Sequence, residues 1–290
     1  MSIIRLALPK GSLQGATIEL FKNAGWRIAT STRSYFPSID DKDIECTLVR
    51  AQEISRYVES GIFDLGLTGK DWILENNSDV KEVADLIYSK VTSKSAKWVL
   101  AVAQDSGINR IEDLEGKSVA TELVNFTKRY FSKLGINVDV EFSWGATEVK
   151  VADGLVDAIV EVTETGSTIK AHNLKIIHEL LVTNTKLIAN KESWKNKKKR
   201  TKIEQIALML KSALQAEAMT GLKMNVPEDR LDDIIKMLPA MTSPTVAPLH
   251  NLKWYSVETI IKETQSRALI PKLLKTGARG IIEYPLKKAL

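Results

Sequence analysis

Residues 158–168 read AIVEVTETGST. An apolar strand ends in a turn here and a helical pattern follows, as in the β–α units of α/β folds. Backbone N–H groups of such a turn converge at the positive end of the following helix, where anions bind readily. Gly166 lets a ligand approach the backbone closely. The turn therefore predicts a phosphate-binding loop, with further donors from a set of hydroxyl residues: Thr163, Thr165, Ser167 and Thr168.

Two carboxylates, Glu161 and Glu164, lie in the same stretch. They are spaced to reach the hydroxyl groups of a sugar attached to the bound phosphate. A phosphate loop together with acidic residues is what a ribose-5-phosphate site requires. The alternative is an ordinary β–α turn with a threonine cap, which is common in any α/β protein.

The first 190 residues alternate short apolar strands with helical patterns, which predicts open α/β sheets. Helices are expected at 12–24, 51–60 and 126–134. Strands are expected at 3–8, 46–49, 64–69, 98–103, 118–121, 138–142 and 158–162.

The last 75 residues have a different pattern, strand–helix–strand–strand–helix–strand, which is ferredoxin-like. The expected strands are 222–226, 245–247, 255–261 and 280–284, and the expected helices are 227–238 and 267–276. A helix over 203–218 connects the two regions, which places the domain boundary near residue 215.

The composition is that of an ordinary globular protein, with 290 residues and a formal net charge of +5. Much of the excess charge lies in the run from Lys195 to Arg200, which we interpret as a solvated loop between a strand and a helix. Nucleic-acid binding through this run is a minor alternative. A single cysteine, Cys46, excludes an internal disulfide. The N-terminal residues lack the pattern of a secretory signal, and no apolar run approaches a membrane span, so we expect a cytoplasmic protein.

The sequence pattern becomes more specific when the residues before the loop are included. Residues 148–168 as a whole resemble the signature of the ATP phosphoribosyltransferase family. Glu161 stands where that family usually has Asp, and Val156 where it usually has a small residue. Further segments resemble the family in the same order along the chain: Leu6-Ala7-Leu8-Pro9-Lys10-Gly11-Ser12-Leu13, residues 50–54, residues 64–71, and residues 119–122 with 125–131.

The resemblance implies a catalytic region folded like a type II periplasmic binding protein, with two α/β lobes around a cleft. Residues 1–94 and 176–215 would form the first lobe and residues 95–175 the second, with the chain crossing near 90–95 and 175–180. Residues 216–290 would form a ferredoxin-like, ACT-like regulatory domain.

The resemblance also implies the reaction: ATP and 5-phosphoribosyl 1-pyrophosphate give 1-(5-phosphoribosyl)-ATP and pyrophosphate, the first step of histidine biosynthesis. Glu161 and Glu164 would face the ribose, and Lys10, Gly11 and Arg50 would lie near pyrophosphate and nucleotide. Mg²⁺ would bind through the substrate rather than in a protein cage. Lys10 and Arg50 could instead be surface charges. Asp71 is open between nucleotide binding and a charge at a helix N-terminus.

The C-terminal region resembles the regulatory domain of the longer members of the family, whose implied effector is histidine bound at a subunit contact. The residues that fall at the corresponding site are Asn225, Met241, Ser243, Thr245 and Gly280. A homo-oligomer, from dimer to hexamer, is therefore expected. The main alternative from another class is a ligand-binding protein without catalysis, because the two-lobed pattern alone fits a solute receptor equally well.

Overall fold

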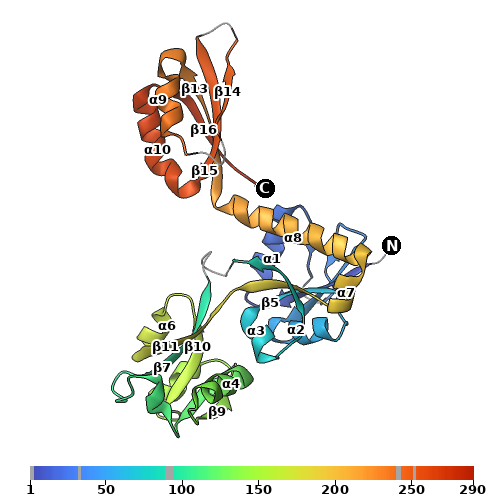
Figure 1. Ribbon diagram of the computed structural model, residues 1–290, viewed down its shortest axis with the longest axis vertical. Coiled ribbons are helices and arrows are strands. Elements are labelled where there is room, and N and C mark those ends of the chain that lie inside the picture. The colour runs from blue at the N-terminus through green and yellow to red at the C-terminus, as the bar shows by residue number, and fades with distance from the viewer. Residues whose placement is uncertain (1–2, 32–33, 89–94, 240–242, 251–252) are drawn as a thin grey trace. The chain divides into compact units, whose positions relative to one another are not determined.

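The computed structural model describes residues 3–31, 34–88, 95–239, 243–250 and 253–290. The chain forms two compact units, one of residues 1–22 and 26–207 and the other of residues 23–25 and 208–290. The first unit holds two five-stranded sheets, and the second holds a four-stranded sheet (Figure 1). Within the described ranges, no helix combines the length and apolar character needed to cross a membrane.

The first lobe is a five-stranded sheet in the order β4-β1-β5-β12-β6. Strand β12 runs antiparallel to both of its neighbours, whereas β1 is parallel to β4 and β5. A short ribbon, β2 (Ile28–Ala29) with β3 (Ser38–Ile39), belongs to the same lobe. The other elements are β1 (Ile4–Lys10), α1 (Gln14–Ala24), β4 (Ile44–Arg50), α2 (Ala51–Glu59), β5 (Leu65–Gly69), α3 (Lys70–Glu75), β6 (Lys81–Leu86) and β12 (Thr185–Ala189).

The second lobe is a sheet in the order β11-β7-β10-β8-β9 that is covered on both faces. Leu100 and Val102 join one buried cluster and Ala101 joins another, as the two-residue period of a strand requires. The elements are β7 (Ala96–Ala103), a 3₁₀ turn (Ile111–Leu114), β8 (Ser118–Thr121), α4 (Val124–Leu134), β9 (Asp139–Phe142), α5 (Thr147–Ala152), β10 (Ala158–Thr163), α6 (Ser167–Ala171) and β11 (Leu174–Thr183).

The chain passes from the second sheet back to the first at Asn184, not near 175–180 as the sequence suggested. Strand β11 stays paired with β7 up to the contact of Thr183 with Ala96, and β12 begins its pairing in the first sheet at Thr185. The ten-residue length of β11 moves the crossing. The expected first crossing, at 90–95, falls mostly outside the described residues.

The interpretation of the basic run as a loop is wrong, because these residues form α7 (Lys191–Lys195) and α8 (Lys197–Glu217). Asn190 caps α7 by accepting hydrogen bonds from the N–H groups of Glu192 and Ser193. Three of the cations have partners: Lys195 pairs with Glu192, Arg200 with Glu204, and Lys199 with Asp64. The run is therefore helical, and Lys199 ties it to the buried Asp64.

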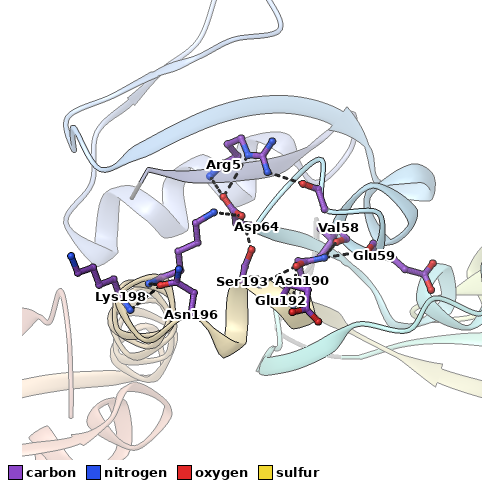
Figure 2. A network of polar contacts seen from close by, with 11 residues as sticks. Arg5, Val58, Glu59, Asp64, Asn190, Glu192, Ser193, Asn196 and Lys198 are labelled. Carbon is purple, nitrogen blue, oxygen red and sulfur yellow. Dashed lines mark hydrogen bonds and ion pairs between the residues drawn. The ribbon is translucent and has the colours of Figure 1, made fainter. Parts of the chain in front are cut away.

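Asp64 is the centre of this network, and its side chain is 1% exposed (Figure 2). Its carboxylate accepts hydrogen bonds from the backbone N–H of Arg5 at 2.9 Å and from Ser193 Oγ and Lys199 Nζ at 2.6 Å each. These bonds hold the pKa of Asp64 below its usual value although burial acts against them. The start of α8 is thus fixed to strands β1 and β5.

The second unit is a sheet in the order β14-β15-β13-β16 with α9 and α10 on one face (Figure 1). It consists of β13 (Met219–Pro227), a 3₁₀ turn (Glu228–Arg230), α9 (Leu231–Met237), β14 (Thr245–Pro248), β15 (Trp254–Lys262), α10 (Glu263–Thr276) and β16 (Arg279–Pro285). The expected ferredoxin-like order of elements is confirmed, as is the two-lobed α/β class of the region before it.

Candidate active site

A cavity of about 440 Å³ lies between the two lobes of the first unit. Its lining comes from the ends of β1, β4 and β5 in one lobe and of β8 and β10 in the other. The crossing at Thr183, Asn184 and Thr185 completes it. In open α/β sheets, ligands bind at such strand ends.

One wall of the cavity is cationic. Strands β1 and β4 are parallel and in register, so that Lys10 pairs with Arg50 at their carboxyl ends. Both residues line the cavity, as does Gly11. Two adjacent positive charges form a suitable surface for a pyrophosphate or triphosphate.

The opposite wall is acidic. Glu164, just after β10, and Glu122, just after β8, both line the cavity. Glu161 lies within β10 and is not among the lining residues. Burial raises the pKa of Glu161 to about 7, and the negative charges of Glu148 and Glu122 add to the effect. Burial and the charge of Asp71 raise the pKa of Glu122 as well. Glu122 thus lies close enough to both Glu161 and Asp71 for their charges to interact.

Asp71 lines the cavity but is almost fully buried, at 7% exposed. Its carboxylate accepts the indole N–H of Trp98 at 2.8 Å and the backbone N–H of Trp72 at 3.0 Å. Burial raises its pKa in spite of these bonds. Gly69 must lack a side chain, because an added Cβ would lie 1.9 Å from Asp71 Oδ1. Asp71 thus joins α3 in one lobe to β7 in the other.

The turn at residues 163–168 has hydrogen bonds of its own. Thr163 Oγ1 accepts the backbone N–H of Gly166 at 2.7 Å, and the hydroxyls of Thr165 and Ser167 are 2.9 Å apart. Gly166 has a φ of +75°, which favours glycine. Thr165, Ser167 and Thr168 are exposed. They follow Glu164, which lines the cavity, but they do not line it themselves.

Several cavity residues were not singled out from the sequence: Trp72, Tyr88, Trp98, Glu122, Thr183, Asn184 and Thr185. Glu122 could have been found, since it follows the strand parallel to β10 and its end must lie beside the phosphate turn. Tyr88 and Trp98 belong to the lobe crossing, for which local sequence gives no comparable signal. Tyr88 is buried, which raises its pKa to about 12, and its hydroxyl lies 2.8 Å from Thr17 Oγ1.

The residues expected at an effector site do not gather in one place within one chain. Asn225 in β13 lies beside Gly280 in β16, where an added Cβ would come within 3.5 Å of Asn225 Nδ2. Thr245 begins β14 at the other edge of the sheet, and Ser243 precedes it. Three strand spacings of about 4.8 Å separate β14 from β16. Met241 lies outside the described residues.

The fold and cavity define a class, that of two-lobed α/β proteins that hold a small molecule between their lobes. A family model described as ATP phosphoribosyltransferase matches residues 50–212, and one described as HisG, C-terminal domain, matches residues 216–288. The chain belongs to the ATP phosphoribosyltransferase family.

Individual relatives agree over the full length. The ATP phosphoribosyltransferase of Desulfosudis oleivorans is 59% identical over 99% of both chains. That of Solidesulfovibrio magneticus is 61% identical over 100% of this chain and 99% of its own. Among solved structures, the ATP phosphoribosyl transferase (HisG:HisZ) complex from Thermotoga maritima gives a TM-score of 0.64 at 28% identity, covering 74% of this chain and 100% of that chain.

Proposed function

We propose that this protein transfers the phosphoribosyl group of 5-phosphoribosyl 1-pyrophosphate to ATP. The observation that carries the proposal is the cavity itself, in which Lys10 and Arg50 form one wall and Glu164 and Glu122 the other. A ribose that carries a pyrophosphate on its anomeric carbon fits this arrangement, with the cations facing the pyrophosphate and the carboxylates facing the ribose. The full-length relatives bear the same activity in their names.

In the proposed reaction, a ring nitrogen of adenine attacks the anomeric carbon of the ribose. The new C–N bond forms as the C–O bond to pyrophosphate breaks, and pyrophosphate leaves with the bonding electrons. The transition state has oxocarbenium character, by analogy with glycoside cleavage. Positive charge on the ribose would be stabilised by Glu161 and Glu164, and negative charge on the leaving group by Lys10 and Arg50.

The turn after β10 would hold the 5-phosphate through Thr165, Gly166, Ser167 and Thr168. Thr163 would act through the turn, because its hydroxyl already accepts the Gly166 N–H. Gly11 and Asp71 would lie on the nucleotide side of the cavity. Asp71 would position this side by joining the two lobes rather than by a free carboxylate.

Mg²⁺ would enter with the pyrophosphate. We propose that the cation is carried by the substrate, as the family resemblance implies, because Mg²⁺ is commonly bound through substrate phosphates. Mg²⁺ neutralises phosphate charge, while Lys10 and Arg50 would bind and orient the remaining oxygens.

The experiment is to mix the protein with ATP, 5-phosphoribosyl 1-pyrophosphate and Mg²⁺, and to follow ultraviolet absorbance of the product and release of pyrophosphate. Both signals should appear together and stop when a chelator removes Mg²⁺. A solute receptor would bind both ligands without ever releasing pyrophosphate. That result would refute the proposed activity.

We also propose that residues 216–290 sense histidine. In the catalytic region, residues 1–94 with 185–215 would form one lobe and residues 95–183 the other, since the chain crosses at Asn184. The separation of Thr245 from Gly280 across the sheet favours a site completed by a second copy of the chain. A homo-oligomer is part of this proposal.

A further inference from the structure

Tyr35 is an exposed aromatic residue next to the cationic wall, and no motif in the sequence points to it. Its side chain is 54% exposed. The Lys10 ammonium nitrogen lies 3.7 Å from the centre of the Tyr35 ring, well within the range of a cation–π contact. A ring that lies half in solvent and contacts a cavity cation needs an explanation beyond core packing.

The contact between Tyr35 and Lys10 offsets charge repulsion between Lys10 and Arg50. Lys10 and Arg50 are direct partners in adjacent strands, so two positive charges are held side by side before any anion arrives. Like charges in this position repel each other. The negative face of the Tyr35 ring lies against one of them. A hydrogen bond with the Lys10 side chain lowers the pKa of the Tyr35 phenol, and the positive charges of Lys10 and Arg50 lower it further.

The backbone at Tyr35 is fixed to the same strand that carries Arg50. The Tyr35 carbonyl accepts the N–H of Leu48 in β4 at 2.8 Å. The segment after Tyr35 is also held in place, since Asp41, just beyond β3, accepts the indole N–H of Trp26 at 2.9 Å and Lys202 Nζ at 2.6 Å. Tyr35 is therefore held in place independently of Lys10.

We propose that Tyr35 is a positioning residue that holds Lys10 beside Arg50 for the polyphosphate of a substrate. The inference rests on the proposed function, since it assigns the ligand of that same wall. The ring fixes the ammonium while leaving its outward N–H groups for phosphate oxygens. The Lys10 side chain therefore loses less conformational entropy when the anion binds.

The test is calorimetric binding of inorganic pyrophosphate with Mg²⁺ to the full chain, which requires no turnover. Exposed cation–π contacts are weak, so Tyr35→Leu should raise the dissociation constant about two- to fivefold. Tyr35→Phe keeps the ring and loses only the phenol oxygen, which also interacts with Lys10, so it should bind more tightly than Tyr35→Leu. Phe36→Leu, at a neighbouring residue that is 74% exposed, is the matched control and should also bind normally.

A double-mutant cycle identifies Lys10 as the intermediary. In a Lys10→Met background, Tyr35→Leu should cause no further loss, because the cation it positions is absent. Unchanged or tighter pyrophosphate binding in Tyr35→Leu would overturn the proposal, and so would an equal loss in the Lys10→Met background. Failure of the unaltered protein to release pyrophosphate from its substrates would instead refute the proposed function, whatever the Tyr35 variants do.

Discussion

Glu161 is a carboxyl group whose ionisation falls within the physiological pH range, because burial and neighbouring carboxylates raise its pKa to about 7. If the ionised form stabilises positive charge on the ribose, kcat/KM should rise as pH passes through about 7. Glu161→Gln should remove this rise and lower kcat roughly 100-fold or more. Initial rates measured from pH 5.5 to 9 for both proteins check this expectation. Glu161→Asp, which restores the residue usual in the family, should retain the rise.

The raised pKa of Glu161 also predicts how the stability of the folded protein changes with pH. In the unfolded chain Glu161 ionises near 4.5, whereas in the folded chain it keeps its proton up to about 7. The folded state therefore loses stability as pH rises between these values, and the loss stays constant above them. Glu161→Gln should melt at progressively higher temperature than the unaltered protein across this window. A difference in Tm that is flat with pH would contradict the raised pKa.

Two threonines in the phosphate turn have separable roles. Thr168→Val should weaken 5-phosphoribosyl 1-pyrophosphate binding about ten- to a hundredfold, as expected for loss of a hydrogen bond to a charged group, with little change in Tm. Thr163→Val should weaken binding and also disturb the turn, because the Thr163 hydroxyl accepts the Gly166 N–H. Calorimetry beside melting curves distinguishes them. A Tm loss without an affinity loss in Thr168→Val would favour the simple capping interpretation.

The sequence predicted several residues at the ends of apolar strands but missed Glu122, and it also missed the residues that depend on the lobe crossing. Lys10, Arg50 and Glu164 stand at strand ends, and each lines the cavity. Tyr35 lies in an irregular segment whose contact with Lys10 depends on tertiary packing against β4. No periodicity signals such a contact.

Among the helices, α3 and α4 form a connection between the lobes. Glu75, the last residue of α3, accepts the backbone N–H groups of Asn125 and Phe126 at 3.0 and 2.8 Å in the first turn of α4. Its carboxylate thus satisfies N–H groups that a helix start leaves without partners. Glu75→Gln should lower the free energy of unfolding by about 1–2 kcal/mol. Denaturant unfolding measures this loss.

Because Glu75 joins two lobes, its replacement should also change how readily the cavity opens. Small-angle scattering without substrate should give a larger radius of gyration for Glu75→Gln than for the unaltered protein. Glu59→Gln is the control, since Glu59 accepts the N–H of Asp79 at 2.8 Å within a single lobe. An equal expansion in both variants would show that general loosening, and not the connection, is responsible.

The elements were predicted from sequence where polarity alternates clearly. Strand 118–121 and the four strands of the second unit match within a few residues. Strand β11 was missed, because Leu174–Thr183 mixes Lys175, His178 and Glu179 with its apolar residues. The basic run was misread for a related reason. One of its charges, Lys199, is paired with Asp64, a partner distant in sequence that local composition cannot indicate.

In the molecule as a whole, helix α8 is the segment shared by the two units. Helix α8 begins in the catalytic unit, where Lys199 and Lys202 pair with Asp64 and Asp41, and continues into the second unit. The Lys199–Asp64 pair is largely buried, at 21% and 1% exposed. Lys199→Met leaves Asp64 with fewer partners and should destabilise the protein by about 3 kcal/mol. Since these bonds lower the pKa of Asp64, the unaltered protein should lose its advantage over the variant as pH falls into the acid range. A constant difference down to acid unfolding would exclude this pair as the source.

Histidine inhibition tests whether residues 216–290 bind an effector at a contact between two chains. Within one chain, Thr245 and Gly280 lie at opposite edges of the sheet, so a free amino acid cannot contact both unless a second chain supplies one side. Histidine binding should therefore increase as the chains self-associate. Sedimentation velocity should show larger species when histidine is present. Thr245→Ala should weaken inhibition several-fold or more, in line with couplings of about 1–3 kcal/mol, and should leave the rate without histidine intact. Thr245→Ser keeps the hydroxyl and should restore inhibition. If inhibition is unchanged in Thr245→Ala and histidine competes with ATP, the effector binds in the catalytic cavity, and residues 216–290 must be given another role.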